Sequence, residues 1–170
     1  MRTTTHAVRF TITQEIACDV ARHWRLFLDD AYDREQYLQG LRYPAYEIVE
    51  RSESDAEVRR TIKVTPLLEL PGPVQKLLGN GFGYVEAGRF DKATQIWTST
   101  TTPNMLRGRL RSSSIVRCEP AGDDRCTRIC ELSVEANVFA IGSLVESSLE
   151  KNLRTGWAGA AAHMNAYVSR

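Results

Sequence analysis

The feature that most constrains the fold is a long helical pattern at the C-terminal end of the chain. From Ile141 to about Val168, apolar residues recur every three or four positions, as on one face of an amphipathic helix. They are Val145, Leu149, Leu153, Trp157, Ala160, Met164 and Tyr167 or Val168. At about 1.5 Å per residue such a helix would be roughly 40 Å long, enough to span a small sheet.

The middle of this helix is rich in small residues, Gly156-Trp157-Ala158-Gly159-Ala160. Each glycine weakens a helix by up to about 1 kcal/mol, so its presence needs a reason. Either another segment approaches the helix closely there, or side-chain volume is left out to keep a space open.

The rest of the chain predicts an antiparallel sheet. Residues Ala7 to Ile16 alternate apolar and polar, as a half-buried strand does. Six further strands are predicted at Tyr46–Ser52, Val58–Val64, Phe82–Asp91, Thr94–Thr102, Leu106–Glu119 and Cys126–Phe139. Short turns between strands imply antiparallel pairing. Two short helices are predicted between the first two strands, one capped by Asp19 and one over Ala31–Gly40.

Length, net charge and hydrophobicity limit the number of domains, the partners and the location that the sequence predicts. The 170 residues predict a single domain, 1–170. Lys+Arg number 22 against 21 Asp+Glu, so no global field favours nucleic acid as a partner. The N-terminus lacks the apolar region of a signal peptide, and no apolar run reaches the roughly 20 residues of a membrane span. The cytoplasm is the expected location.

The four cysteines are Cys18, Cys118, Cys126 and Cys130. They do not predict a disulfide framework in a chain of this size. A zinc site would need closely spaced ligand pairs, usually with histidines. We expect buried, reduced thiols that act as small apolar side chains, with no metal and no cofactor.

The apolar stretch Pro66 to Asn80 interrupts the strand pattern. It is a cover over a cavity mouth, an element that touches a membrane, or a short helix packed on the sheet. In the first case the gating side chains are Leu67, Leu68, Val74, Leu77 and Leu78.

Strand alternation also separates the two faces of the sheet. The inner face is marked by apolar residues such as Phe10, Ile62, Tyr84, Leu110 and Val134. Polar residues of the same parity are informative, because buried polar groups need partners. They are Arg60, Glu86, Thr98, Thr100, Ser112, Ser114 and Arg128. If Val64 lies near Phe82, Arg60 falls opposite Glu86.

The order of elements resembles the helix-grip fold of the START-like superfamily, an α+β fold in which a curved seven-stranded antiparallel sheet wraps round a long C-terminal helix. Several stretches are similar to a bacterial family within it, domain of unknown function 2505 (DUF2505). They are Tyr43-Pro44, Gly83-Tyr84-Val85-Glu86 running to Phe90-Asp91, Trp97 ahead of Thr102-Pro103-Asn104, and Gly142-Ser143-Leu144-Val145-Glu146. The resemblance implies a cavity for an apolar ligand between sheet and helix.

The leading hypothesis is a non-enzymatic binder or carrier of a lipid, sterol or polyketide-like molecule. The expected ligand-binding residues are Arg60, Tyr84, Glu86, Thr98, Leu110, Ser112, Val134, Gly156, Ala160 and His163. The alternatives are a cyclase or dehydratase that transfers protons through Glu86 and His163, and an interaction protein whose cavity is filled by Trp157 and Met164.

Transient membrane contact is compatible with each hypothesis. Arg107, Arg109 and Arg111 share the outward face of one predicted strand. They either touch lipid phosphates or form a solvated sheet edge that discourages aggregation.

Overall fold

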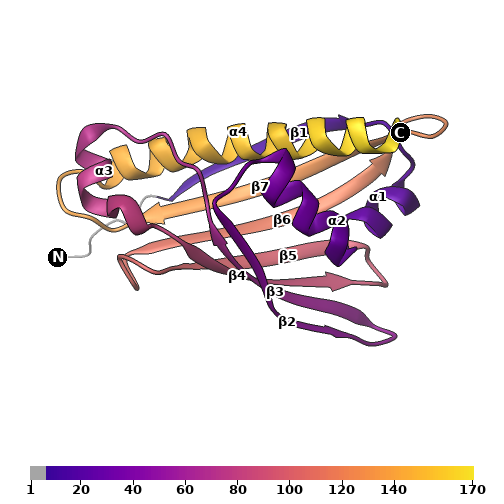
Figure 1. Ribbon diagram of the computed structural model, residues 1–170, viewed down its shortest axis with the longest axis horizontal. Helices are drawn as coiled ribbons and strands as arrows, with labels where there is room; N and C mark the ends of the chain where they lie inside the picture. The colour runs from indigo at the N-terminus through magenta and orange to yellow at the C-terminus, as the bar shows by residue number, and fades with distance from the viewer. Residues whose placement is uncertain (1–6) are drawn as a thin grey trace.

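The computed structural model describes residues 7–170 and consists of a seven-stranded antiparallel sheet with helices on one face (Figure 1). Residues Met1–His6, for which the sequence predicts no signal peptide, lie outside the described range. The strands are β1 (Val8–Ile16), β2 (Ala45–Glu53), β3 (Glu57–Thr65), β4 (Tyr84–Asp91), β5 (Ile96–Pro103), β6 (Leu110–Pro120) and β7 (Cys126–Ala136). Their order is β1-β7-β6-β5-β4-β3-β2, which confirms the predicted α+β helix-grip fold.

Helix α4 (Gly142–Val168) runs along the sheet for 27 residues, as the C-terminal pattern predicts (Figure 1). Helices α1 (Val20–Phe27) and α2 (Asp30–Glu35) lie toward its C-terminal end, and α3 (Gly72–Leu78) lies at the other end. Asp19 caps α1 by accepting a hydrogen bond from the Arg22 backbone at 2.7 Å. The second predicted helix, 31–40, is α2 continued by the π-helical turn η1 (Gln36–Gly40).

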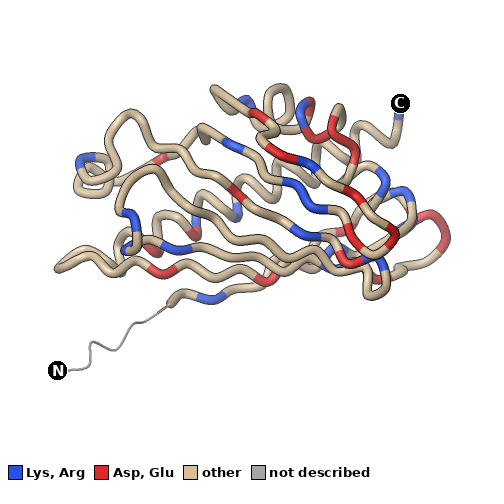
Figure 2. Tube along the Cα trace, turned by 90° about the horizontal axis from the view of Figure 1, so that it is seen from below, with Lys and Arg blue, Asp and Glu red and all other residues tan. Residues whose placement is uncertain are grey.

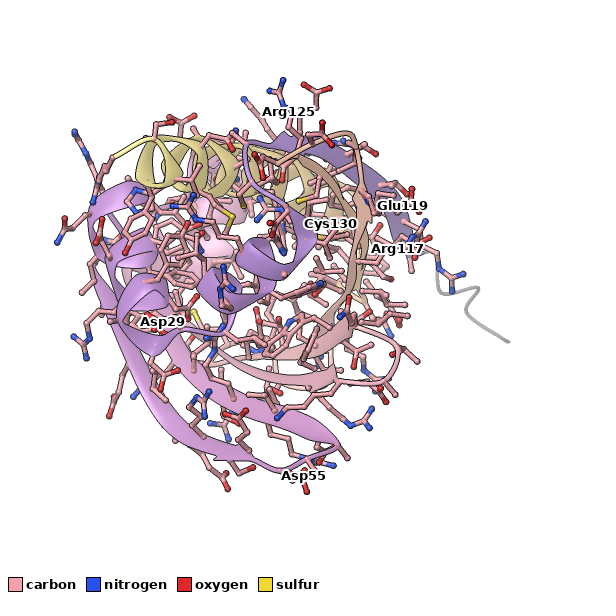
Figure 3. All side chains as sticks on the ribbon, turned by 90° about the vertical axis from the view of Figure 1, so that its right-hand side faces the viewer. Asp29, Asp55, Arg117, Glu119, Arg125 and Cys130 are labelled. Carbon is pink, nitrogen blue, oxygen red and sulfur yellow. The ribbon has the colours of Figure 1, made fainter. Side chains whose placement is uncertain are left out.

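The sheet curves around an interior filled with side chains, and charged groups such as Asp55, Arg117 and Glu119 project outward (Figure 3). Basic and acidic residues intermingle over the face seen in Figure 2. The centre of the core joins Trp24 of α1 to Phe90, Trp97 and Leu132 of the sheet. Among residues 7–170, no helix is long and apolar enough to cross a membrane.

In strand β5, the prediction of which side chains face the interior is wrong. Trp97 and Ser99 are buried on the inner face, whereas Thr98 and Thr100 are exposed on the outer face. The turn before the strand ends at Gln95, whose φ is 55°, and the strand begins only at Ile96. Burial of the large indole of Trp97 then fixes which side chains point inward.

Strand β6 corrects a second interpretation. It begins at Leu110 and lies between β5 and β7, so the predicted solvated edge is wrong. Arg107 and Arg109 lie in the segment before the strand, and both are exposed, as is Arg111.

Gly88 on β4 makes room for the indole of Trp97. A Cβ added at Gly88 would lie 1.8 Å from Cζ2 of Trp97. We expect Gly88→Ala to lower the free energy of unfolding by about 2 kcal/mol, because the buried indole must shift. In the control Gly72→Ala, the added Cβ meets nothing within 4 Å, and stability should stay the same or rise slightly. Urea denaturation measures both variants, and equal stabilities would contradict this packing.

Candidate functional site

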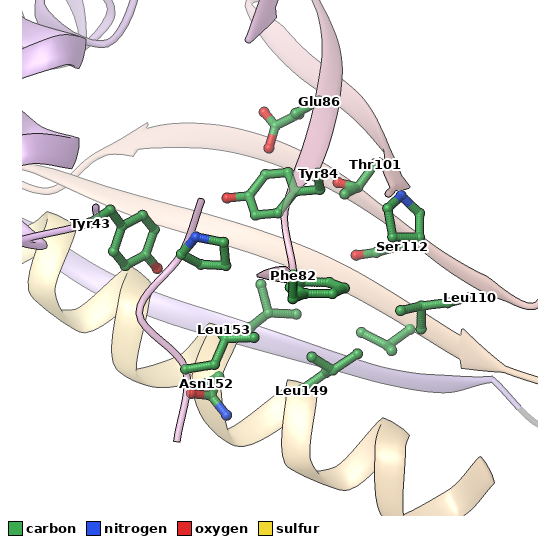
Figure 4. Close-up of a pocket in the computed structure, with 14 residues that line it drawn as sticks. Tyr43, Phe82, Tyr84, Glu86, Thr101, Leu110, Ser112, Leu149, Asn152 and Leu153 are labelled. Atoms are coloured by element: carbon green, nitrogen blue, oxygen red, sulfur yellow. The ribbon is translucent and has the colours of Figure 1, made fainter. Parts of the chain in front are cut away.

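Two adjoining pockets lie between the concave face of the sheet and α4. The first, called here the apolar compartment, has a volume of about 100 Å³. Its lining residues are Tyr43, Pro66, Leu68, Phe82, Tyr84, Glu86, Thr101, Pro103, Leu110, Ser112, Val134, Leu149, Asn152 and Leu153. In Figure 4, Leu149 and Leu153 of α4 face Phe82, Tyr84 and Leu110 from the sheet side. Most of this lining is hydrocarbon, which suits an apolar ligand body.

The second pocket, called here the polar compartment, also has a volume of about 100 Å³. It is lined by Phe27, Asp33, Gln36, Tyr37, Leu41, Tyr43, Arg60, Ile62, Tyr84, Glu86, Trp97, Arg128, Leu153, Gly156, Trp157 and Ala160. The two compartments share Tyr43, Tyr84, Glu86 and Leu153. These four residues mark the junction between an apolar and a polar space.

Glu86 is the acid at this junction. Strand alternation on β4 directs Tyr84 and Glu86 to the same face, and both project into the pocket (Figure 4). Burial, aided by the negative charge of Asp33, raises the pKa of Glu86 to about 7, while the Arg60 guanidinium and the Ser99 hydroxyl oppose the shift. A carboxyl group with this pKa can donate or accept a proton near neutral pH.

Arg60 is a buried cation with two acidic partners. Its Nη2 lies 3.4 Å from Oδ2 of Asp33 and donates to the Phe27 carbonyl at 3.0 Å. Its Nη1 lies 3.8 Å from Oδ1 of Asp30. The Tyr46 hydroxyl donates to the Asp33 carboxylate. These contacts join α2 to β2 and β3 beneath the polar compartment.

Arg128 is the second buried cation. Its side chain is 1% exposed and donates from Nε and Nη2 to Oε1 of Gln14 at 3.0 and 2.6 Å. Its guanidinium lies 5.0 Å from the ring centre of Trp157 on α4. Within residues 7–170, no carboxylate lies within 4.0 Å of it. Burial accordingly lowers the pKa of Arg128.

The structure brings eight of the ten predicted ligand-binding residues to the two compartments. They are Arg60, Tyr84, Glu86, Leu110, Ser112, Val134, Gly156 and Ala160. Arg60 does not lie opposite Glu86, because Val64 pairs with Tyr84 rather than with Phe82. Arg60 therefore pairs with Gly88, and Glu86 with Ile62.

Thr98 and His163 do not line either compartment. Thr98 is on the outer face of β5. His163 faces η1 and α2, where its Nε2 lies 3.4 Å from Oε1 of Glu35 and its ring packs on Tyr32. A Cβ at Gly40 would lie 2.7 Å from the imidazole, so Gly40 permits this close packing. Glu86 and His163 therefore do not converge on one wall, an arrangement that would have favoured the alternative of a proton-transferring enzyme.

The glycines in the middle of α4 have the first of the two predicted explanations, a close approach, and Gly156 also lines the polar compartment. A Cβ added at Gly156 would lie 3.1 Å from Oη of Tyr43, and one at Gly159 would lie 2.8 Å from Cδ2 of Leu41. The segment that follows η1 therefore lies directly against the helix at the mouth of the polar compartment.

The interrupting segment 66–80 divides into two parts. Val74 and Leu78 of α3 are fully buried against Val145 of α4, and Leu77 packs on the same cluster, so α3 is a packed helix. Leu68 lines the apolar compartment, whereas Leu67 is 63% exposed.

Asn152 fastens the first part of this segment to α4. Its Oδ1 accepts from the Glu69 backbone N–H at 2.9 Å, and its Nδ2 donates to the Glu69 carbonyl at 2.8 Å. The strap over residues 66–70, which carries Leu68, is thus held across one side of the apolar compartment.

All four cysteines are free, and three of them, Cys18, Cys126 and Cys130, are buried. Burial raises the pKa of Cys18 and of Cys130 to about 11, which makes these thiols poor nucleophiles. No group of three His, Cys, Asp or Glu side chains within residues 7–170 is arranged to hold a metal ion.

Several lining residues were not among the predicted site residues. They are Asp33, Gln36, Tyr37, Tyr43, Thr101, Arg128, Asn152 and Leu153. Strand alternation in the sequence already places Arg128 on the inner face of the sheet, and Tyr43 belongs to the Tyr43-Pro44 motif. No sequence pattern marks the helical residues Asp33 and Asn152 as site residues, because their roles depend on tertiary contacts.

Comparison with known proteins identifies the family. The chain matches the family described as "Protein of unknown function (DUF2505)" over residues 11–168, and no curated protein matches. Among solved structures it is similar to the Zhui aromatase/cyclase of a Streptomyces species, with 11% identity, a TM-score of 0.66 and 96% of each chain covered.

Two further solved structures have the same fold. Norcoclaurine synthase from Thalictrum flavum has 14% identity and a TM-score of 0.66, over 98% of this chain and 89% of that one. A START superfamily protein from Mycobacterium smegmatis has 15% identity and a TM-score of 0.60, over 95% and 97%. At these identities the likeness concerns the fold alone, and the family match places the chain more narrowly. The chain belongs to the DUF2505 family and has the helix-grip fold of the START-like superfamily.

Proposed function

We propose that this protein binds an apolar small molecule between the sheet and α4. The observation that carries the proposal is the apolar compartment, whose hydrocarbon lining adjoins a small set of polar groups. Burial of ligand surface would supply affinity at about 25 cal/mol per Å². The polar groups at the junction, Tyr43, Tyr84 and Glu86, would orient the ligand.

Entry is proposed at the strap over residues 66–70. Leu68 contributes to the lining there, and the two hydrogen bonds to Asn152 hold the strap closed. Two hydrogen bonds of this kind contribute about 1 kcal/mol each, so the strap can open without unfolding α3. Gating by Leu67 and Leu68 therefore stays part of the proposal, whereas Val74, Leu77 and Leu78 hold α3 in place.

The proposed location is the cytoplasm, which keeps thiols reduced, in agreement with the four free cysteines.

Transient membrane contact is proposed at the end of the molecule where the β7–α4 loop and α3 lie (Figure 1). Phe139 in that loop is 98% exposed.

A substitution that fills the apolar compartment tests the proposed function. Ser112 lines the apolar compartment, whereas the next residue, Ser113, is exposed on the outer face. We expect Ser112→Phe to weaken binding of the neutral fluorophore 6-propionyl-2-dimethylaminonaphthalene at least about tenfold, a loss of about 1.4 kcal/mol. Ser113→Phe should bind as the wild type does. Fluorescence titration measures both, and equal affinities would exclude this compartment as the binding site.

A second candidate function is proton-transfer catalysis on the bound molecule. The observation that favours it is Glu86, an acid with a pKa of about 7 at the junction of the two compartments. Glu86→Gln distinguishes the two functions when the protein is incubated with a metabolite extract of its host. Catalysis predicts a product mass that forms with the wild type and not with the variant, whereas carriage predicts the same bound, unaltered molecule with both.

A further inference from the structure

Arg128 has hydrogen-bonding capacity that the described chain does not use. A guanidinium carries five N–H donors, and its two hydrogen bonds both end on the single acceptor Oε1 of Gln14. The side chain is nonetheless 1% exposed and lines the polar compartment. Donors on a buried cation normally meet acceptors, and usually a carboxylate.

Among residues 7–170, no carboxylate lies within 4.0 Å of Arg128 to balance its charge. Its pairing neighbours across the sheet are Gln14 and Cys118, and Trp157 covers it from α4. His23 lies in the same region, and burial together with the Arg128 charge lowers the pKa of His23 to about 3. The imidazole is therefore neutral and adds no second positive charge, and the guanidinium has no carboxylate counterion within 4.0 Å among residues 7–170.

The other buried arginine gives the contrast. Arg60 meets Asp33 at 3.4 Å and Asp30 at 3.8 Å. The wall of the polar compartment thus holds two guanidinium groups, and within the described part of the chain only Arg60 has carboxylates within 4.0 Å. An isolated buried charge is strongly unfavourable unless a partner of opposite charge reaches it.

We propose that Arg128 binds the carboxylate of the ligand, so that the molecule carried is a monocarboxylic acid with an apolar body. This inference rests on the proposed function, because it names the ligand class of the same cavity. One uncompensated cation matches one negative charge, and the planar fork of a guanidinium matches a carboxylate in particular. The carboxylate lies in the polar compartment, and the body extends past Tyr84 and Leu153 into the apolar compartment.

A matched pair of probes tests the ligand class. 4-Phenylbutyrate and 4-phenylbutan-1-ol differ at the carboxylate and share the apolar body. Isothermal titration calorimetry is expected to give the wild type an affinity at least about tenfold higher for the acid, as charged hydrogen bonds supply. Arg128→Met should bind both probes equally. Arg111→Met removes a positive charge from the exposed outer face and should keep the preference for the acid.

Thermal unfolding separates a ligand-binding arginine from a structural one. Without probe, Arg128→Met should melt at the same temperature as the wild type or higher, since the variant no longer buries an uncompensated charge. A preference for the acid that survives in Arg128→Met would overturn the inference. A large drop in the melting temperature of probe-free Arg128→Met would also overturn it, because Arg128 would then be a structural residue.

The unmodified protein gives an independent result. The ¹⁵N resonance of Arg128 Nε should move on addition of 4-phenylbutyrate and stay in place with the alcohol. Equal binding of both probes, with no shift at Arg128, would overturn the inference while leaving the proposed function standing. Failure of both probes and of the neutral fluorophore to bind would overturn both.

Discussion

Replacing Asp33 with asparagine is expected to lower the free energy of unfolding by about 3 kcal/mol, because the substitution leaves the buried Arg60 guanidinium without its main counterion. The Asp33 carboxylate lies 3.4 Å from Nη2 of Arg60 and accepts a hydrogen bond from Tyr46. Burial raises the pKa of Asp33, whereas the Arg60 guanidinium and the Tyr46 hydroxyl oppose that shift by stabilising the carboxylate. Asparagine removes one buried charge but leaves the Arg60 cation buried and unpaired, and the cost of that cation exceeds the gain. Urea denaturation at neutral pH measures the effect.

The chain offers matched controls for Asp33→Asn. Asp30 also lies near Arg60, at 3.8 Å, but its side chain is 42% exposed, so Asp30→Asn should cost less than about 1 kcal/mol. Combining Asp33→Asn with Arg60→Met should recover most of the lost stability, since the variant then buries no isolated charge. A loss below about 1 kcal/mol in Asp33→Asn alone would mean that Asp33 is already protonated in the folded protein.

Replacing Glu86 with glutamine is expected to stabilise the protein at pH 8 by up to roughly 3 kcal/mol and to change little at pH 4. The pKa of Glu86 is raised from 4.5 to about 7 in the folded chain, chiefly by burial. Between these values the folded chain holds more protons than the unfolded one. The free energy of unfolding therefore falls as pH rises from about 4.5 to about 7, and the variant escapes that loss.

The measurement is the stability difference between Glu86→Gln and the wild type in urea at several pH values. Glu47→Gln removes an exposed carboxylate from β2 and should show no comparable dependence on pH. A difference for Glu86→Gln that is the same at pH 4 and pH 8 would contradict a raised pKa at the junction of the compartments.

Most of the fold could be predicted because each local signal agreed with the global arrangement. The alternation in β1, the turn residues after β6 and the 3.6-residue period of α4 each specify one structure. The turn before β5 does not indicate which side chains of the strand face inward, since the positive φ of Gln95 shifts the first strand residue to Ile96. The indole of Trp97, which needs burial, is the stronger indication of which side chains of β5 face the interior.

The candidate site was less predictable, because it depends on how separate elements approach one another. The inward positions of Tyr84, Glu86 and Ser112 follow from strand alternation alone. The partner of Arg60 lies on α2, and no spacing in the sequence connects Arg60 with Asp33. His163 lies on the predicted stripe of α4. Because η1 packs against the helix there, the His163 side chain contacts η1 and α2 instead of the cavity.

The most direct test of the central claim, that the space between sheet and α4 holds an apolar ligand, is native mass spectrometry of the protein purified from its own host. Organic extraction then identifies anything released. The expected result is one stoichiometric organic molecule, absent from Ser112→Phe and present in Ser113→Phe. A clean mass of the ligand-free wild type, unchanged after exposure to a lipid extract of the host, would contradict the claim.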